Sequence, residues 1–200
     1  AYEIRPRDWS SDVCSSDLAG AESAVVIGHS MGALIALELA RTAPARVSRL
    51  LLIGAAGRMP VHPDLLDAAL RNHHDAIDMM NLWGHGQLAG LGGSRAPGVW
   101  MVGAAERILE RAAAGVLHAD LSACNGFDGL SHAAEIVAPA LLVCGERDMM
   151  TPLRNARALA GLLTKAEVRV LKGAGHMLLA ERPNDLVTAM ADWIVTPAGS

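Results

Sequence analysis

The sequence predicts an α/β protein in which a mostly parallel sheet of about four strands is flanked by helices and interrupted by a helical insert. Three apolar runs, at residues 24–27, 50–53 and 139–144, predict strands, and the alternating pattern of residues 167–171 predicts a half-buried fourth strand. A glycine-containing loop follows each run, and helix-forming segments separate the strands. Because strands that alternate with helices form parallel sheets, we expect the four loops at one edge of the sheet.

A short glycine-containing segment joins the first predicted strand to a helix. Residues 28–32 read GHSMG, and an apolar, helix-forming run follows directly. A serine at such a sharp turn is typical of an exposed nucleophile, and a side chain at Gly28 or Gly32 is expected to crowd the neighbouring backbone. We therefore predict Ser30 as a nucleophile and the N–H of Met31, at the positive end of the helix, as an oxyanion donor. The alternative is a plain strand-to-helix turn.

A serine nucleophile needs a histidine base and a carboxylate that orients this base. Asp148 lies in the loop after the third predicted strand, and His176 lies in the glycine-rich loop after the fourth. We expect both at the sheet edge that carries Ser30. Thr151 and Pro152 predict the N-cap and first turn of the helix that follows Asp148.

Three segments carry a resemblance to a known family: GHSMG at residues 28–32, GERDMMTP at residues 145–152 and GAGHMLLAERP at residues 173–183. From about residue 24 to residue 194, the chain resembles the C-terminal two-thirds of an α/β-hydrolase of the esterase and lipase superfamily. The resemblance implies the α/β-hydrolase fold, with a partial, mostly parallel sheet, flanking helices and a helical lid insert.

The same resemblance assigns roles to single residues. It implies Ser30 as nucleophile, His176 as general base and then acid, and Asp148 as orienting carboxylate, in the chain order that belongs to this fold. It also implies the N–H of Met31 as an oxyanion donor. For His29, a packing and hydrogen-bonding role under the turn is preferred to proton transfer.

Other carboxylates are weaker candidates for the acid. The loop after residues 50–53 contains no acid, which favours Asp148. Glu146 substitutes for it only if the loop has another shape, while Asp120 and Asp128 fall in the insert. We expect solvated or capping roles for these three.

The N-terminal segment does not read as part of the fold. Residues 8–18, DWSSDVCSSDL, resemble one reading frame of a common DNA-sequencing adapter, and the alternative is a natural linker rich in Ser and Asp. We therefore interpret residues 1–18 as artefactual or disordered and the chain as N-terminally truncated, so that a second oxyanion donor is missing. The rest divides into a partial core, residues 19–59 and 137–200, and a helical cap or lid, residues 60–136.

The predicted lid supplies the only indication of the substrate. Helical patterns cover residues 64–72 and 102–114, and the glycine-rich stretch 84–98 is expected to be a flexible hinge. Five apolar side chains are candidates to wall an acyl pocket, with core packing as the alternative: Met79, Met80, Trp83, Trp100 and Met101. We predict no metal site, because His73, His74 and His85 lack partners at a convincing spacing.

The composition and charge of the chain argue against two classes of function. A net charge of −4 gives no indication of nucleic-acid binding, and no apolar stretch is long enough to span a membrane. We predict a cytoplasmic serine hydrolase that needs no cofactor and cleaves a small-molecule carboxylic ester with a small to medium apolar acyl group. Lactone, amide or carbon–carbon hydrolysis, acyl transfer, perhydrolysis and a non-catalytic ligand-binding role remain as alternatives.

Overall fold

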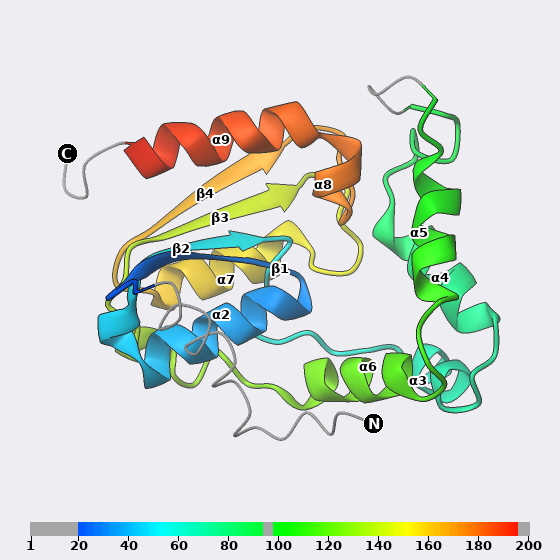
Figure 1. Ribbon diagram of the computed structural model, residues 1–200, viewed down its shortest axis with the longest axis horizontal. Coiled ribbons are helices and arrows are strands. Elements are labelled where there is room, and N and C mark those ends of the chain that lie inside the picture. The colour runs from blue at the N-terminus through cyan, green and yellow to red at the C-terminus, as the bar shows by residue number, and fades with distance from the viewer. Residues whose placement is uncertain (1–19, 94–97, 196–200) are drawn as a thin grey trace.

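The computed structural model describes residues 20–93 and 98–195, and in this part of the chain the predicted α/β architecture is confirmed (Figure 1). Four parallel strands form one sheet in the order of the chain: β1 (Ala24–His29), β2 (Val47–Ile53), β3 (Ala140–Gly145) and β4 (Ala166–Leu171). Residues 1–18, set aside on sequence grounds, lie outside the described residues.

The register of the sheet brings the ends of the strands together. Gly28 of β1 pairs with Leu52 of β2, and Ile53 of β2 pairs with Val143 of β3. Side chains alternate between the two faces, as the pleat of a strand requires. The loops after β1, β3 and β4 therefore leave the sheet at one edge.

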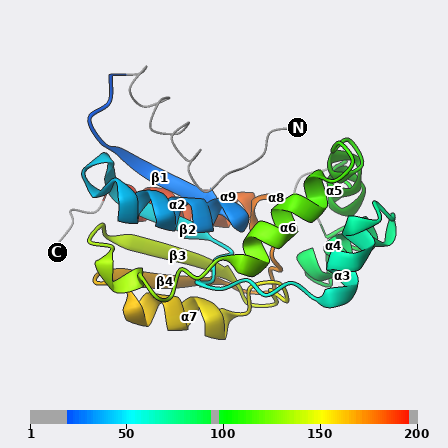
Figure 2. The same ribbon diagram turned by 90° about the horizontal axis from the view of Figure 1, so that it is seen from below.

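Helices cover both faces of the sheet (Figures 1 and 2). The helices α2 (Met31–Thr42) and α7 (Leu153–Leu162) lie on one face, and α9 (Pro183–Val195) lies on the other after the short α8 (Leu178–Glu181). Two 3-10 turns, η1 (Pro44–Arg46) and η2 (Ala133–Glu135), precede β2 and β3.

The core consists of one apolar cluster on each side of the sheet. On the side of α2 and α7, Leu50, Leu52 and Leu142 are fully buried. On the side of α9, Leu51 and Leu141 meet residues of α8 and α9. Neighbouring leucines thus pack on opposite faces of the sheet. This determines the register of the strands, because a slip of one residue would move each leucine to the other face.

In the described part of the chain between β2 and β3, four helices sit beyond the carboxyl ends of the strands (Figure 1). We call them the insert helices: α3 (Pro63–Leu70), α4 (Asp75–Gly84), α5 (Met101–Leu109) and α6 (Val116–Gly126). The predicted helix 102–114 ends earlier than expected, since α5 stops at Leu109. Gly115, which has a left-handed backbone with φ of 84°, precedes the first residue of α6.

The insert helices have a small apolar core of their own, in which Leu65 of α3, Ala76 of α4 and Leu121 of α6 are buried. No helix in residues 20–93 or 98–195 has both the length and the apolar character needed to cross a membrane.

Candidate active site

Ser30 stands alone between the end of β1 and the start of α2, in a strained conformation. Its φ of 54° and ψ of −119° belong to a region that residues with a side chain rarely adopt, at a cost of about 1–3 kcal/mol. Its N–H donates to the carbonyl of Ile53, at 3.0 Å, which ties the turn to the neighbouring strand. Met31 is the first residue of α2, so its N–H has no acceptor within the helix.

The two glycines of this turn differ in their surroundings, although the sequence predicted that a side chain at either position would crowd the neighbouring backbone. A Cβ on Gly28 would lie 2.2 Å from the carbonyl oxygen of Gly32 and 2.6 Å from the nitrogen of Ala33. A Cβ on Gly32 would meet no atom of a described residue within 4 Å. The tight packing of strand against helix therefore requires a glycine at position 28 alone.

Asp148 lies in the turn after β3, where its carboxylate is almost fully buried and fully bonded. Oδ1 accepts the N–H groups of Met150, at 2.9 Å, and Thr151, at 2.7 Å. Oδ2 accepts the hydroxyl of Thr151, at 2.7 Å, and Nδ1 of His176, at 2.8 Å. Burial by itself raises the pKa of Asp148, but the hydrogen bond and the charge of His176, with the bonds from Thr151, outweigh it and lower this pKa.

Thr151 has another role than the N-cap predicted from the sequence. Pro152 occupies the N-cap of α7, and no side chain caps this helix end. The Thr151 hydroxyl instead bonds Asp148 and lies 3.2 Å from Nδ1 of His176. This threonine, 2% exposed, is therefore part of the carboxylate–imidazole pair.

His176 follows β4 on the loop that the sequence predicted, and the structure brings it to Asp148. The imidazole is 2% exposed, and its Nε2 is buried without a hydrogen-bond partner among the described residues. A Cβ on Gly54, at the end of β2, would lie 3.0 Å from Nδ1. The ring therefore packs directly on the backbone of β2, and Nδ1 rather than Nε2 is engaged by the carboxylate.

His29 packs against the loop that carries His176 and bonds its backbone, as expected. Its Nε2 donates to the carbonyl of His176, at 2.9 Å, and the two ring centroids are 4.9 Å apart. Burial lowers the pKa of His29, and the nearby charge of His176 lowers it further. A neutral His29 is thus favoured beside the second imidazole.

Glu181 was assigned no role from the sequence. It is 5% exposed, and its carboxylate accepts the N–H of Gly86, at 3.0 Å, and the N–H of Gly175, at 3.1 and 3.0 Å. Gly175 directly precedes His176, so Glu181 fixes the histidine loop to the chain after α4. An acidic residue within the otherwise apolar run of α8 is the signal that sequence reasoning overlooked.

The stretch expected to be a flexible hinge is bonded to the same loop where it begins. The carbonyl of Gly84 accepts the N–H groups of His176 and Met177, both at 2.9 Å. Together with the Gly86–Glu181 bond, this connects the end of α4 to the histidine loop. Residues 94–97 of the predicted hinge lie outside the described residues.

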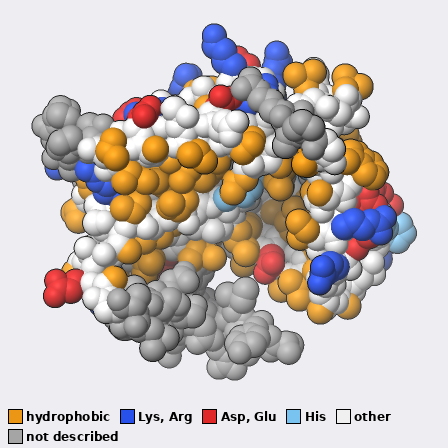
Figure 3. Space-filling view, turned by 45° about the horizontal axis from the view of Figure 1, so that its top comes forward, with side chains coloured by type: hydrophobic (Ala, Val, Ile, Leu, Met, Phe, Trp, Pro, Cys, Tyr) orange, Lys and Arg blue, Asp and Glu red, His pale blue; other side chains and the backbone are white. Residues whose placement is uncertain are grey.

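A cavity of about 450 Å³ opens beside Ser30 between the sheet and the insert helices. Two of the five predicted pocket residues, Met80 and Trp83, line it. Met79 packs against the core of the insert helices without lining the cavity, Met101 is buried outside the cavity lining, and Trp100 is 66% exposed. Figure 3 shows hydrophobic side chains gathered around a hollow on this side of the molecule.

Known proteins share both the sequence pattern and this architecture. A family model described as "Alpha/beta hydrolase family" matches residues 1–189, nearly the whole chain. The chain belongs to the alpha/beta hydrolase family. The match includes residues 1–18, so the segment set aside on sequence grounds falls within it.

Individual relatives agree with this assignment. A pimeloyl-[acyl-carrier protein] methyl ester esterase from Aromatoleum aromaticum is 29% identical to this alpha/beta hydrolase, and the match covers 86% of this chain and 74% of the esterase. A monoacylglycerol lipase from Xenopus laevis is 32% identical over 60 residues, 30% of this chain and only 18% of the lipase. A thermophilic esterase of known structure matches with a TM-score of 0.76 at 28% identity, over 92% of this chain and 70% of its own.

The other candidate acids of this alpha/beta hydrolase have different surroundings. Glu146 accepts the N–H of Gly173, at 2.9 Å, in the histidine loop. Asp128 pairs with Arg58 on the surface and accepts the N–H of Leu130, as expected for a capping role. Asp120, in contrast to that expectation, lines the cavity beside Ser30.

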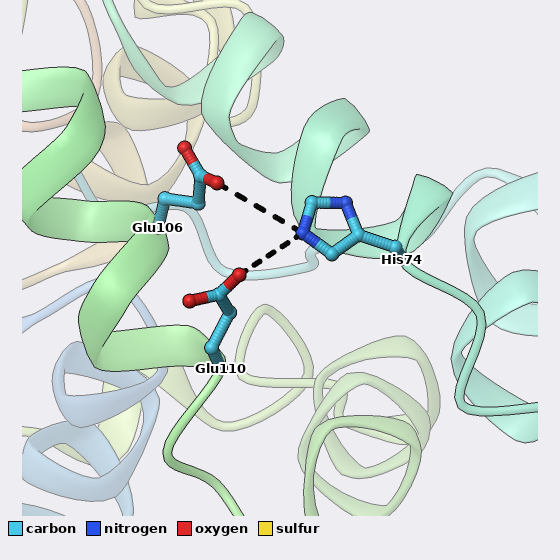
Figure 4. A group of neighbouring side chains, drawn as sticks. All are labelled: His74, Glu106 and Glu110. Carbon is cyan, nitrogen blue, oxygen red and sulfur yellow. Dashed lines mark hydrogen bonds and ion pairs between the residues drawn. The ribbon is translucent and has the colours of Figure 1, made fainter.

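One group of potential metal ligands lies between two insert helices, away from the Asp148–His176 pair (Figure 4). Nε2 of His74 lies 3.2 Å from Glu110 and 3.9 Å from Glu106. Arg107 also binds Glu110, at 2.6 Å, and His74 bonds Asp78 through its other nitrogen, at 3.3 Å. These side chains neutralise one another as an ion-pair network, and a metal ion is not needed to explain it.

Proposed function

We propose that this alpha/beta hydrolase is a serine hydrolase that cleaves a carboxylic ester with a small to medium apolar acyl group through an acyl-enzyme. The observation that carries the proposal is the buried Asp148–His176 pair, whose free Nε2 belongs to the same sheet edge as the strained Ser30. The esterases among its relatives support an ester as the substrate class.

The proposed reaction assigns each group a task. Asp148 holds Nδ1–H of His176, so that Nε2 is free to take the proton of Ser30 as its Oγ attacks the ester carbonyl. The N–H of Met31 stabilises the oxyanion, and His176 returns the proton to the leaving alcohol. Water, activated by the same imidazole, then releases the acid from Ser30.

The surroundings of the pair favour this sequence of steps. Because the bonds from His176 and Thr151 lower the pKa of Asp148, its carboxylate remains ionised while the imidazole becomes positive. We also propose that residues 60–136 act as the cap that closes over the substrate, since Met80, Trp83 and Leu65 from this part of the chain wall the cavity.

Ester turnover and covalent labelling test the proposal. The chain is assayed with 4-nitrophenyl butyrate and treated with a fluorophosphonate probe, and the labelled peptide is located by mass spectrometry. We expect label on Ser30, loss of turnover and of label in Ser30→Ala, and a fall of about 10⁴ in kcat for Asp148→Asn. Turnover of Ser30→Ala near that of the wild type, or label on another residue, would overturn the assignment. A panel of lactone, amide and thioester substrates separates the other reactions open to the same three residues.

A further inference from the structure

The cavity beside Ser30 is mostly apolar, and its described lining contains one carboxylate, Asp120, and no Lys or Arg that could balance its charge. One face of α6 lines it with Leu117, Asp120, Leu121 and Cys124, at the spacing of successive helical turns. Most of the other lining side chains come from Met, Leu, Trp, Val and Pro residues. Asp120 therefore projects from the middle of an apolar wall.

No hydrogen bond or ion pair reaches the Asp120 carboxylate from any residue in the described part of the chain. The described lining contains no Lys or Arg, and its imidazole, His62, lies beside the exposed Asp64 at 3.7 Å. Partial burial raises the pKa of Asp120, the direction expected for a carboxylate that loses water and gains no partner.

The position of α6 relates this carboxylate to the proposed nucleophile. Cys124, one turn after Asp120, is buried in the core on the side of α2, the helix that begins directly after Ser30. Leu117, one turn before Asp120, packs with the insert helices at the other end of the wall. An acyl chain that extends from Ser30 along α6 thus passes Asp120 at a distance from its carbonyl.

We propose that Asp120 is a specificity-determining residue, which selects acyl groups that carry a hydrogen-bond donor, such as an ammonium or hydroxyl group, and disfavours acyl groups that carry a carboxylate. This inference rests on the proposed function, because it names the substrate class of the same site. A donor group on the acyl chain would bond the Asp120 carboxylate, whereas a second carboxylate would repel it across the mostly apolar cavity.

Four ethyl esters of equal chain length test the proposal: unsubstituted, ω-amino, ω-hydroxy and ω-carboxy octanoate. Their kcat/KM values are measured at about pH 8, where exposed imidazoles are neutral. The ratio of the amino to the carboxy ester is the readout, because the cost of bringing a charged tail into an apolar cavity largely cancels in it. Opposite charges about 6 Å apart at an effective dielectric of about 20 correspond to a factor of about 100.

In the wild type we expect an amino-to-carboxy ratio of about 100 or more, which falls to below about 10 in Asp120→Asn. Asp67→Asn is the matched control, because it removes the same charge from an exposed position of α3 that pairs with Arg71 outside the cavity. Its ratio should stay within about twofold of the wild type, as expected for a screened surface charge. An unchanged ratio in Asp120→Asn, with turnover of the neutral ester intact, would overturn the role of Asp120 and leave the proposed function standing.

A binding experiment without turnover distinguishes the role of Asp120 from the proposed function. Octylammonium and octanoate are titrated into the wild type and into Asp120→Asn by calorimetry, without any chemical step. We expect octylammonium to bind more tightly than octanoate to the wild type only. If no ester is turned over, the proposed function fails. The calorimetric titration alone then decides the role of Asp120. Equal preference in both proteins would refute it.

Discussion

Gly28→Ala tests whether the turn at Ser30 depends on direct contact between β1 and α2. The added Cβ would lie 2.2 Å from the carbonyl oxygen of Gly32, 2.4 Å from its carbonyl carbon and 2.6 Å from the nitrogen of Ala33. All three atoms belong to the backbone of the first turn of α2. A change of rotamer therefore cannot relieve the contact, and the helix itself has to move away from the strand.

The expected loss of stability follows from this geometry. Overpacking that side chains can accommodate costs about 1–3 kcal/mol, and displacement of backbone lies at or beyond the upper end. We expect Gly28→Ala to lower the free energy of unfolding by about 3 kcal/mol or more. For a chain of this size, that corresponds to a fall of roughly 6–12 °C in Tm.

Gly32→Ala provides a matched control at the other glycine of the turn. Its Cβ would have no described neighbour within 4 Å, and alanine in a helix is favoured over glycine by about 0.5–1 kcal/mol. Urea unfolding followed by far-ultraviolet circular dichroism measures both variants against the wild type. We expect Gly32→Ala to be unchanged or slightly more stable.

The contrast between the two variants is the decisive quantity. If Gly28→Ala loses less than about 1 kcal/mol, β1 and α2 do not touch as the structure shows. If both variants lose about the same amount, the requirement for glycine is symmetric about Ser30, as the sequence pattern alone suggests, and the structural distinction is wrong.

Two further perturbations address the segments around the site. Glu181→Gln replaces a buried acceptor by an amide whose NH₂ group faces the N–H groups of the histidine loop and of the chain after α4. We expect the free energy of unfolding to fall by about 1–3 kcal/mol, because buried donors lose their acceptor. A loss below about 0.5 kcal/mol in urea unfolding would contradict this. The hydrogen bonds with Glu110 and then Asp78 raise the pKa of His74, so the stability that its charge contributes is fully present below the unfolded-state pKa and is lost as pH rises through the folded-state pKa. Wild type should therefore exceed His74→Gln in stability at about pH 6 and match it at about pH 9, whereas an equal difference at both pH values would refute the ion pair.

The sequence predicted the sheet well because the signals there are local. Each strand contains an apolar run or an alternating apolar pattern that ends at a glycine-containing loop, and the pairing in chain order follows from the parallel α/β pattern. The loops that carry Ser30, Asp148 and His176 were predicted for the same reason. Their catalytic roles stay predictions, but the contact between Asp148 and His176 follows from strands whose ends are aligned.

The insert was harder to predict, because its helices pack on several surfaces at once. Met79, Met80 and Trp83 lie within two turns of α4, yet only Met80 and Trp83 reach the cavity beside Ser30. All three pack against the core of the insert helices, and apolar character alone does not show which of them also line the cavity. Asp120 was missed for the converse reason, since a carboxylate on a helix predicts a solvated face.

The bonds around Glu181 bear on how substrate reaches Ser30. The end of α4 and the histidine loop share hydrogen bonds through Gly84, Gly86 and Glu181, three of them to the backbone of residues 175–177. A rigid outward swing of α4 would break the bonds made by Gly84 and Gly86 and so remove this support from the loop that holds His176 beside Asp148. Entry of substrate that leaves the pair intact therefore requires that this end of the insert stays fixed. Gly86 in this segment is explained by close packing, since a Cβ at this position would lie 2.7 Å from the Glu181 carboxylate.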